Sequence, residues 1–403
     1  MNSQCIIPDI DPFDDHIMKH YIWHPDPIVC DDTPSLLYLD YDGILQINKS
    51  VYPNSKQWDL LCTYSIVELI DDNNVKFLPE LKFTPPVYIE TDVFLVQCKK
   101  NRTVVFKDLF QKVDFKSLLK EKHIENENDE KLSIFMFGLD SISRLTAIRK
   151  LPKTMKYLQE TLKAYVFKGH NKIADNTYPN LIALLTGKFD REHKVNEKKE
   201  YMEKFNFIWS NFSEAHYVTM HGEDWPEIAT FNMGCKGFGK QPTDHYQRRF
   251  FLAMRKVQPY HLKVEQVFLF LERYVQLRKR SALCFGNRKI HMIVLEYCKQ
   301  FMEAYRGKLR FNFGWLTELS HNFINFIEVA DQDFYELFKW LHEKQHLNRT
   351  VLIFYGDHGS RQDEIRNTYI GRIEDRMPLF SIVIPEHIKQ KYPHIHQESF
   401  IKY

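Results

Sequence analysis

The 403-residue sequence lacks any uninterrupted apolar run of about 18 residues, so no segment is predicted to cross a bilayer. Glycine and proline are scarce, at 14 and 17 residues, which excludes a collagen-like or low-complexity chain. Neither sign of charge dominates, because 55 Lys and Arg stand against 53 Asp and Glu. A basic surface that binds nucleic acid or an anionic membrane is therefore not expected.

The composition is instead that of a folded chain with a large core. Apolar residues make up 44% of the sequence and include 31 Phe and 21 Tyr, which excludes disorder as the main state. At roughly 100–200 residues per domain, this length allows two or three domains, or one large α/β domain with an appendage.

The cysteine pattern favours disulfides over a metal cluster. No C-x-x-C pair occurs, and the first four of the seven cysteines are widely spaced, which suits two disulfides within a small N-terminal unit. A bond between Cys235 and Cys284 would leave Cys298 over, and the spacing leaves the pairing open. The seven are Cys5, Cys30, Cys62, Cys98, Cys235, Cys284 and Cys298.

Glycosylation sequons point to the same compartment as the cysteines. Four N-x-[ST] motifs occur, at Asn48, Asn101, Asn211 and Asn348. Disulfides and sequons together predict a glycoprotein of the extracellular space or the secretory-pathway lumen. The first residues lack the basic and apolar regions of a signal peptide, so we expect any leader or anchor to be absent from this sequence.

Two regions of the chain differ in pattern. Residues 1–128 contain short strand-like runs, such as 36–39 and 93–96, separated by Asn, Asp and Pro clusters, which predicts a small β-rich region that contains disulfides. The polar, charged stretch over residues 120–130 is typical of a linker or an exposed loop. We therefore expect a domain boundary there and a second region, the core, over residues 129–403.

The second region alternates buried strands with helices. Residues 132–139 and 351–356 are nearly continuous apolar runs, as in strands buried on both faces of a parallel sheet, and residues 379–384 form a third. Apolar residues at helical spacing predict helices over residues 151–162, 181–186, 264–280 and 325–344. This alternation predicts an α/β fold with a doubly wound, mostly parallel sheet.

Acidic residues directly follow two of these strands. Asp140 and Asp357 each end a buried run, and ligands of doubly wound sheets bind beyond the carboxyl ends of the strands. His358 stands beside Asp357 in a Gly-Asp-His-Gly motif, and carboxylate and imidazole together suit Zn²⁺ or Mn²⁺. The alternative is that each acid simply caps the next helix.

A third segment offers a nucleophile. Thr177 precedes an expected helix, with Pro179 near its first turn, so its hydroxyl lies in the positive field of the helix start. A divalent ion on the same oxygen would lower the hydroxyl pKa and make Thr177 a usable nucleophile. Asn180 would then donate to a non-bridging oxygen of a phosphoryl or sulfuryl group. The alternative is that Thr177 is a plain N-cap.

In kind and order these residues resemble the site of the alkaline phosphatase-like superfamily, with a strand-terminal Asp, a hydroxyl at a helix start and a later Asp-His pair. A closer resemblance is to the DUF229 family, proteins of unknown function from nematodes and insects within that superfamily. It covers roughly residues 1–395 and implies a sulfatase-like core in an extracellular or membrane-anchored protein, without a substrate. The matching blocks are residues 138–144, 151–154, 175–181, 222–225, 242–246, 356–359 and 376–379.

The sequence departs from the superfamily pattern in three places. Position 317 is Thr, where two-metal members carry an Asp that binds the second ion. The weaker candidates for that second site are Glu318 and His321, which are three residues apart and would share one face of a helix. No C-x-P-S-R motif supplies the modified Cys of sulfatases, and Thr177 stands in its place. We also expect the family's last strand and helices to be absent, as in a chain truncated at its C-terminus.

Lipid-headgroup transferases of the superfamily use one ion held by a carboxylate, a Thr and an Asp-His pair. The resemblance therefore implies a metal site of Asp140, Thr177, Asp357 and His358, holding zinc or manganese in preference to calcium. His321 would bind the substrate oxyanion or protonate the leaving oxygen. The alkaline phosphatase-like core is thus predicted to be a metal-dependent hydrolase or transferase of anionic esters, phosphate before sulfate, on a glycan or a lipid headgroup.

Two alternatives stay open at this point. One is a non-catalytic secreted descendant of the superfamily that acts as a binding or structural protein, and the other is a two-metal phosphodiesterase. Three further charged residues also have two interpretations: Lys172 and Arg361 either face an anionic substrate or lie in solvent, and Asp224 is either near the metal or purely structural.

Overall fold

The computed structural model describes residues 8–22, 24–40, 42–53, 58–115, 118–119, 122–128, 130–258 and 283–394. The helix expected over residues 264–280 lies outside this part of the chain. Among the described residues, no helix is both long and apolar enough to span a membrane.

A seven-stranded sheet forms the centre of the molecule, in the order β10-β17-β16-β9-β15-β11-β12. Neighbours from β16 to β12 pair in parallel, while β17 runs antiparallel to both β16 and β10. The predicted α/β fold with a mostly parallel, doubly wound sheet is confirmed. The strands are β9 (Ser133–Leu139), β10 (Tyr165–Val166), β11 (Val218–Glu223), β12 (His245–Tyr246), β15 (Arg310–Leu316), β16 (Thr350–Gly356) and β17 (Phe380–Val383).

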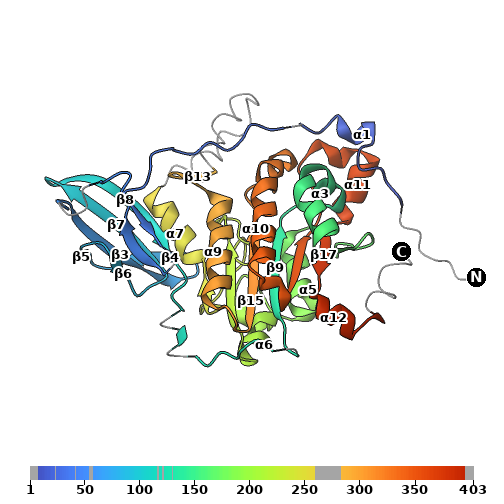
Figure 1. Cartoon of the computed structure of the whole chain (residues 1–403). Coiled ribbons are helices and arrows are strands. Elements are labelled where there is room, and N and C mark those ends of the chain that lie inside the picture. The colour runs from blue at the N-terminus through green and yellow to red at the C-terminus, as the bar shows by residue number, and fades with distance from the viewer. Residues whose placement is uncertain are drawn as a thin grey trace, which may run out of the picture.

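Apolar clusters cover both faces of this sheet, which explains the continuous apolar runs. In β9, Phe135 and Phe137 belong to the cluster with α9 and α10, whereas Met136 belongs to the cluster with α5 and α6. Figure 1 shows α9 and α10 side by side along one face of the strands. The helices nearest the sheet are α5 (Thr177–Thr186), α6 (Ile208–Glu214), α7 (Arg248–Val257), α9 (Ile290–Ala304) and α10 (Asp331–Glu343).

Shorter helices complete the core around these layers. The predicted helix over residues 151–162 is α4 (Pro152–Lys156), continued by a π-helix over Tyr157–Thr161. The predicted helix over 325–344 is a 3₁₀ segment, Ile324–Ala330, followed by α10. The others near the site or the chain ends are α1 (Asp15–Met18), α3 (Arg144–Lys150), α11 (Tyr369–Arg376) and α12 (Glu386–Lys391).

The N-terminal region is β-rich, as predicted. One antiparallel sheet has the order β4-β3-β7-β8, with β5 paired to β3, and a second has the order β1-β2-β6. Both lie at one end of the central sheet (Figure 1). Their strands are β1 (Leu37–Leu39), β2 (Ile44–Ile47), β3 (Leu61–Asp71), β4 (Asn74–Phe77), β5 (Leu81–Phe83), β6 (Val87–Tyr88), β7 (Val93–Lys100) and β8 (Thr103–Gln111).

The disulfides correct part of the cysteine prediction. Cys62 and Cys98 pair across β3 and β7, within the N-terminal region as expected. Cys30, however, pairs with Cys284 in the hairpin of β13 (Cys284–Phe285) and β14 (Arg288–Lys289), so this bond joins the two regions. Cys235 therefore has no disulfide to Cys284, and both Cys235 and Cys298 are free thiols. Cys5 lies outside the described residues.

The N-terminal region is bound tightly to the core. The carboxylate of the buried turn residue Asp72 accepts three hydrogen bonds from the core. The donors are the side-chain amide of Asn232 (2.6 Å), the backbone N–H of Phe238 (2.9 Å) and the hydroxyl of Tyr246 (2.9 Å). Residues before β1 cross to the far end of the central sheet, where α1 lies beside α3 and α11 (Figure 1). The division at residue 128 stays a prediction, and these contacts show that the two regions meet at a buried, hydrogen-bonded turn.

Candidate metal centre

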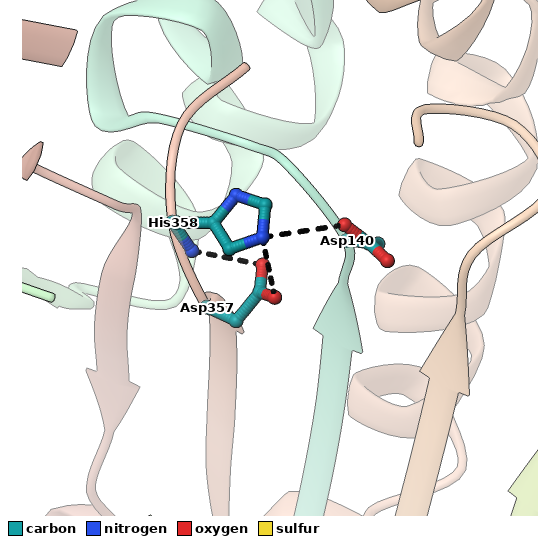
Figure 2. Close-up of side chains that lie close together, drawn as sticks. All are labelled: Asp140, Asp357 and His358. Atoms are coloured by element: carbon teal, nitrogen blue, oxygen red, sulfur yellow. Dashed lines mark hydrogen bonds and ion pairs between the residues drawn. The ribbon is translucent and has the colours of Figure 1, made fainter. Parts of the chain in front are cut away.

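The centre lies at the carboxyl ends of β9 and β16, which are neighbours in the sheet. The register sets Leu139 opposite Gly356, so the next residues, Asp140 and Asp357, emerge side by side. Figure 2 shows the side chains of Asp140, Asp357 and His358 turned toward one another from these two strand ends. One ligand atom from each lies within 4.8 Å of the others, and all three residues are buried.

The imidazole of His358 presents a lone pair to the two carboxylates. Its Nδ1 lies 2.8 Å from the carbonyl oxygen of Gly359, so Nδ1–H donates there and neutral His358 leaves Nε2 as an acceptor. Nε2 lies 3.2 Å from Oδ2 of Asp357 and 3.9 Å from Oδ1 of Asp140. Lone pairs that face each other at this distance require a cation between them, either a metal ion or a proton carried by the ring or by one of the carboxylates.

Ser141 fixes the two carboxylates from the loop after β9. Its backbone N–H donates to Oδ1 of Asp357 (3.0 Å), and its hydroxyl donates to Oδ1 of Asp140 (2.8 Å). The backbone of Ser141 is left-handed, with φ of 61°, a conformation that costs an L-residue about 1 kcal/mol. The backbone N–H of His358 also donates to Oδ1 of Asp357, at 2.8 Å.

These contacts leave ligand atoms available for a cation. Oδ2 of Asp357 is buried and accepts no hydrogen bond from the described residues. Burial, together with the charge of Asp357, raises the pKa of Asp140 to about 8. A buried pair of carboxylates with an orphaned oxygen and an imidazole lone pair fits a divalent cation, because the cation would offset the repulsion and desolvation that oppose ionisation.

Thr177 lies beside this group. Its Oγ1 is 3.4 Å from Oδ2 of Asp140 and 3.4 Å from Nε2 of His358. Asn176 occupies the N-cap position of α5, so Thr177 is the first helical residue and the alternative that Thr177 is a plain N-cap is wrong. The hydroxyl thus faces the candidate ligands from the positive end of a ten-residue helix.

Asn180 binds the loop before α5 in this structure. Its Oδ1 accepts from the backbone N–H groups of Ile173 (2.9 Å) and Ala174 (3.0 Å), and its Nδ2 donates to the carbonyls of Ala174 (2.9 Å) and Asn176 (3.0 Å). Both amide protons are therefore engaged. The predicted donation from Asn180 to a substrate oxygen would require one of these bonds to break, so its observed role is to position the loop before Thr177.

The weaker second-site candidates do not join the three-residue group. Among the described residues, Asp140, Asp357 and His358 form the one group of three or more metal-binding side chains close enough to share an ion, and Glu318 and His321 lie outside it. His321 hydrogen-bonds Asn322 (2.8 Å), and its ring lies near that of Trp225. A catalytic role for His321 stays a prediction.

Asp224 holds the loop that carries these two residues. Its carboxylate accepts from the backbone N–H groups of Thr317 (2.9 Å) and Glu318 (3.2 Å). Burial raises the pKa of Asp224 to about 7, against the lowering effect of the two backbone donors. The structural interpretation of Asp224 is the one that its contacts support.

Two glycines of the Gly-Asp-His-Gly motif are required by close packing. A Cβ on Gly356 would lie 2.2 Å from the carbonyl oxygen of Ile142, and one on Gly359 would lie 2.2 Å from that of Glu374. The missing side chains admit the loop that carries Ser141 and the helix α11.

Comparison with known families decides the classification. The family described as "Protein of unknown function (DUF229)" matches residues 29–399. The chain belongs to the DUF229 family. No curated protein matches this DUF229 chain.

Three solved structures illustrate what the chain is similar to. The lipoteichoic acid synthase LtaP from Listeria monocytogenes shares 13% identity over 67% of this chain and 71% of that chain, with a TM-score of 0.40. The C-terminal periplasmic domain of EcEptC from Escherichia coli, in complex with Zn, shares 12% identity over 70% and 82%, with a TM-score of 0.40. The phosphonate monoester hydrolase SpPMH from Silicibacter pomeroyi shares 13% identity over 64% and 68%, with a TM-score of 0.43.

Proposed function

We propose that this DUF229 chain is a metal-dependent hydrolase or transferase of phosphate esters, and less readily of sulfate esters, with Thr177 as the nucleophile. The observation that carries the proposal is the position of Thr177 Oγ1, 3.4 Å from both Asp140 and His358. Asp140, Asp357 and His358 would hold one divalent ion, for which zinc or manganese suits the mixed oxygen and nitrogen ligands.

A bound divalent ion would supply Lewis acidity and lower the pKa of the Thr177 hydroxyl. The Thr177 proton passes toward Asp140, and Oγ1 bonds to phosphorus as the ester bond to the leaving oxygen breaks. The leaving oxygen takes up a proton from solvent. Water or an acceptor hydroxyl then attacks phosphorus and gives up its proton to solvent, while the Oγ1–phosphorus bond breaks and Oγ1 takes back its proton from Asp140. The N-terminus of α5 stabilises the negative charge on the transferring group.

The compartment is part of the proposal. Two disulfides, Cys30–Cys284 and Cys62–Cys98, are typical of proteins from oxidising compartments. We therefore place this glycoprotein in the extracellular space or the secretory-pathway lumen, where an ester on a glycan or a lipid headgroup would be its substrate.

The test is turnover of aryl phosphates, aryl phosphodiesters and aryl sulfates by protein loaded with zinc or manganese. We expect wild-type activity, a loss of at least about 100-fold in Thr177→Ala and partial retention in Thr177→Ser, which keeps the hydroxyl. Activity in Thr177→Ala equal to wild type would contradict the nucleophile. Absence of turnover with all three substrate classes would favour the non-catalytic alternative.

A further inference from the structure

Arg361, at the edge of the candidate centre, makes no ion pair with a carboxylate among the described residues. Arg361 follows His358 by three residues and donates from its guanidinium to Oδ1 of Asn176 at 2.6 Å. Asn176 directly precedes Thr177, so the guanidinium is held at the start of α5, next to the proposed nucleophile. Its Nε is buried and makes no hydrogen bond within the described chain, and Arg361 forms no ion pair with the described residues.

Two other cations near the start of α5, Lys172 and Arg366, are matched by carboxylates. Lys172 contacts Asp175 at 3.0 Å and the buried Asp375 at 2.8 Å. Arg366 contacts the second oxygen of Asp375, at 3.5 Å. This outer group of two cations and two anions is neutral, so Lys172 is not available to balance a phosphate charge, as one interpretation of the sequence had it.

The charges nearest Thr177, those of Asp140, Asp357 and Arg361, can be counted in the same way. Asp140 and Asp357 carry two negative charges when they are ionised, and a divalent ion would offset both. Arg361 then remains as one further positive charge, held beside Thr177 by its hydrogen bond to Asn176. The three candidate ligand residues are buried, so a charge left unbalanced among them is costly. Arg361 is half-buried and lies at the rim, with its Nε covered and its bond to Asn176 at the surface.

We infer that the group taken by this site is a tetrahedral ester with one negative charge, a phosphodiester or a sulfate monoester, and that Arg361 recognises its charged oxygen. One such charge leaves the occupied site neutral. A phosphate monoester carries close to two charges above its second pKa of about 6, and would leave the site negative. The inference rests on the proposed function and narrows its substrate class.

The first experiment measures kcat/KM of the metal-loaded protein at pH 8 for bis(4-nitrophenyl) phosphate, 4-nitrophenyl sulfate and 4-nitrophenyl phosphate. We expect at least one of the two singly charged esters to exceed 4-nitrophenyl phosphate by tenfold or more. The one with the higher kcat/KM then shows whether the substrate is a phosphodiester or a sulfate ester. Preference for 4-nitrophenyl phosphate would overturn the inference while leaving the proposed function intact.

The second experiment removes the positive charge. Arg361→Gln should lower kcat/KM for the favoured singly charged ester by about 10–100-fold, the usual effect of losing a charge-assisted hydrogen bond. Arg372→Gln is the matched control, because Arg372 is exposed on α11 and the substitution removes the same charge. Equal activities of the two variants would overturn the role of Arg361.

The third experiment reads binding without turnover. The same three esters are titrated calorimetrically into metal-loaded Thr177→Ala and into Thr177→Ala combined with Arg361→Gln. We expect the singly charged ester to bind at least tenfold more tightly than 4-nitrophenyl phosphate, and this preference to be lost in the double variant. If Thr177→Ala binds the singly charged ester more tightly but the wild-type protein turns over none of the three esters, the inference is supported and the proposed catalysis is contradicted. Equal binding of all three esters would overturn the inference.

Discussion

At the scale of single residues, Ser141 controls the spacing of the two carboxylates. One residue bonds Asp140 through its hydroxyl and Asp357 through its backbone N–H, in a left-handed conformation that only a constrained loop maintains. The sequence predicts the carboxylates, because each follows a buried strand. It does not reveal Ser141, since neither its φ nor its contact with a strand more than two hundred residues later leaves a local pattern.

The role of Ser141 can be separated from its backbone strain. Ser141→Ala and Ser141→Gly both remove the hydroxyl, so both should bind zinc about tenfold more weakly, as when a side chain that orients a metal ligand is lost. Ser141→Gly should be more stable than Ser141→Ala by about 1 kcal/mol, because glycine adopts positive φ freely. Zinc titration and urea unfolding measure the two effects. Wild-type zinc affinity in Ser141→Ala would contradict the orienting role.

At the scale of elements, the strands that the sequence predicts are those that are apolar on both faces. β9, β16 and β17 appear where residues 132–139, 351–356 and 379–384 predict them. The central strands β11 and β15 were missed because polar residues interrupt them. In β15, Asn312 donates to the carbonyl of Met136 (3.1 Å), which lies 176 residues earlier, a long-range contact that no local pattern reveals.

The start of α5 depends on the four hydrogen bonds of Asn180. Asn180→Ala would leave backbone groups of residues 173–176 without partners, so we expect a loss of about 2 kcal/mol in the free energy of unfolding. Asn180→Asp keeps the acceptor for Ile173 and Ala174 but turns a carboxylate oxygen toward the carbonyls of Ala174 and Asn176, so it should lose at least as much. Urea unfolding measures both variants. If Asn180→Asp is as stable as wild type but inactive, direct donation to substrate, rather than loop positioning, becomes the better explanation.

At the scale of the whole molecule, the N-terminal region and the core are joined at distant points. The Cys30–Cys284 bond, the Asp72 turn and a contact of 3.1 Å between Asp92 and His245 tie the N-terminal sheets to the core. The sequence indicated a boundary near residue 128 from polarity alone, and pairing of Cys30 with Cys284 was not predictable, because a separation of 254 residues carries no local signal.

These contacts predict that the two regions unfold together. Asp72→Ala removes a buried acceptor of three hydrogen bonds and should destabilise the whole chain by about 3 kcal/mol, in a single transition. Asp42→Ala, at an exposed position of the same region, should change stability by less than about 0.5 kcal/mol. Urea unfolding followed by fluorescence and by circular dichroism is the measurement. Two separate transitions in wild type would instead favour independent domains.

The metal content per chain tests the account most directly. Protein equilibrated with zinc and then dialysed should hold one ion per chain by elemental analysis, both in wild type and in Glu318→Gln. Asp357→Asn removes a ligand charge from the centre and should hold less than about a tenth of that amount. Two ions in wild type with one lost in Glu318→Gln, or undiminished zinc in Asp357→Asn, would contradict a single cation held between the two strand ends and the start of α5.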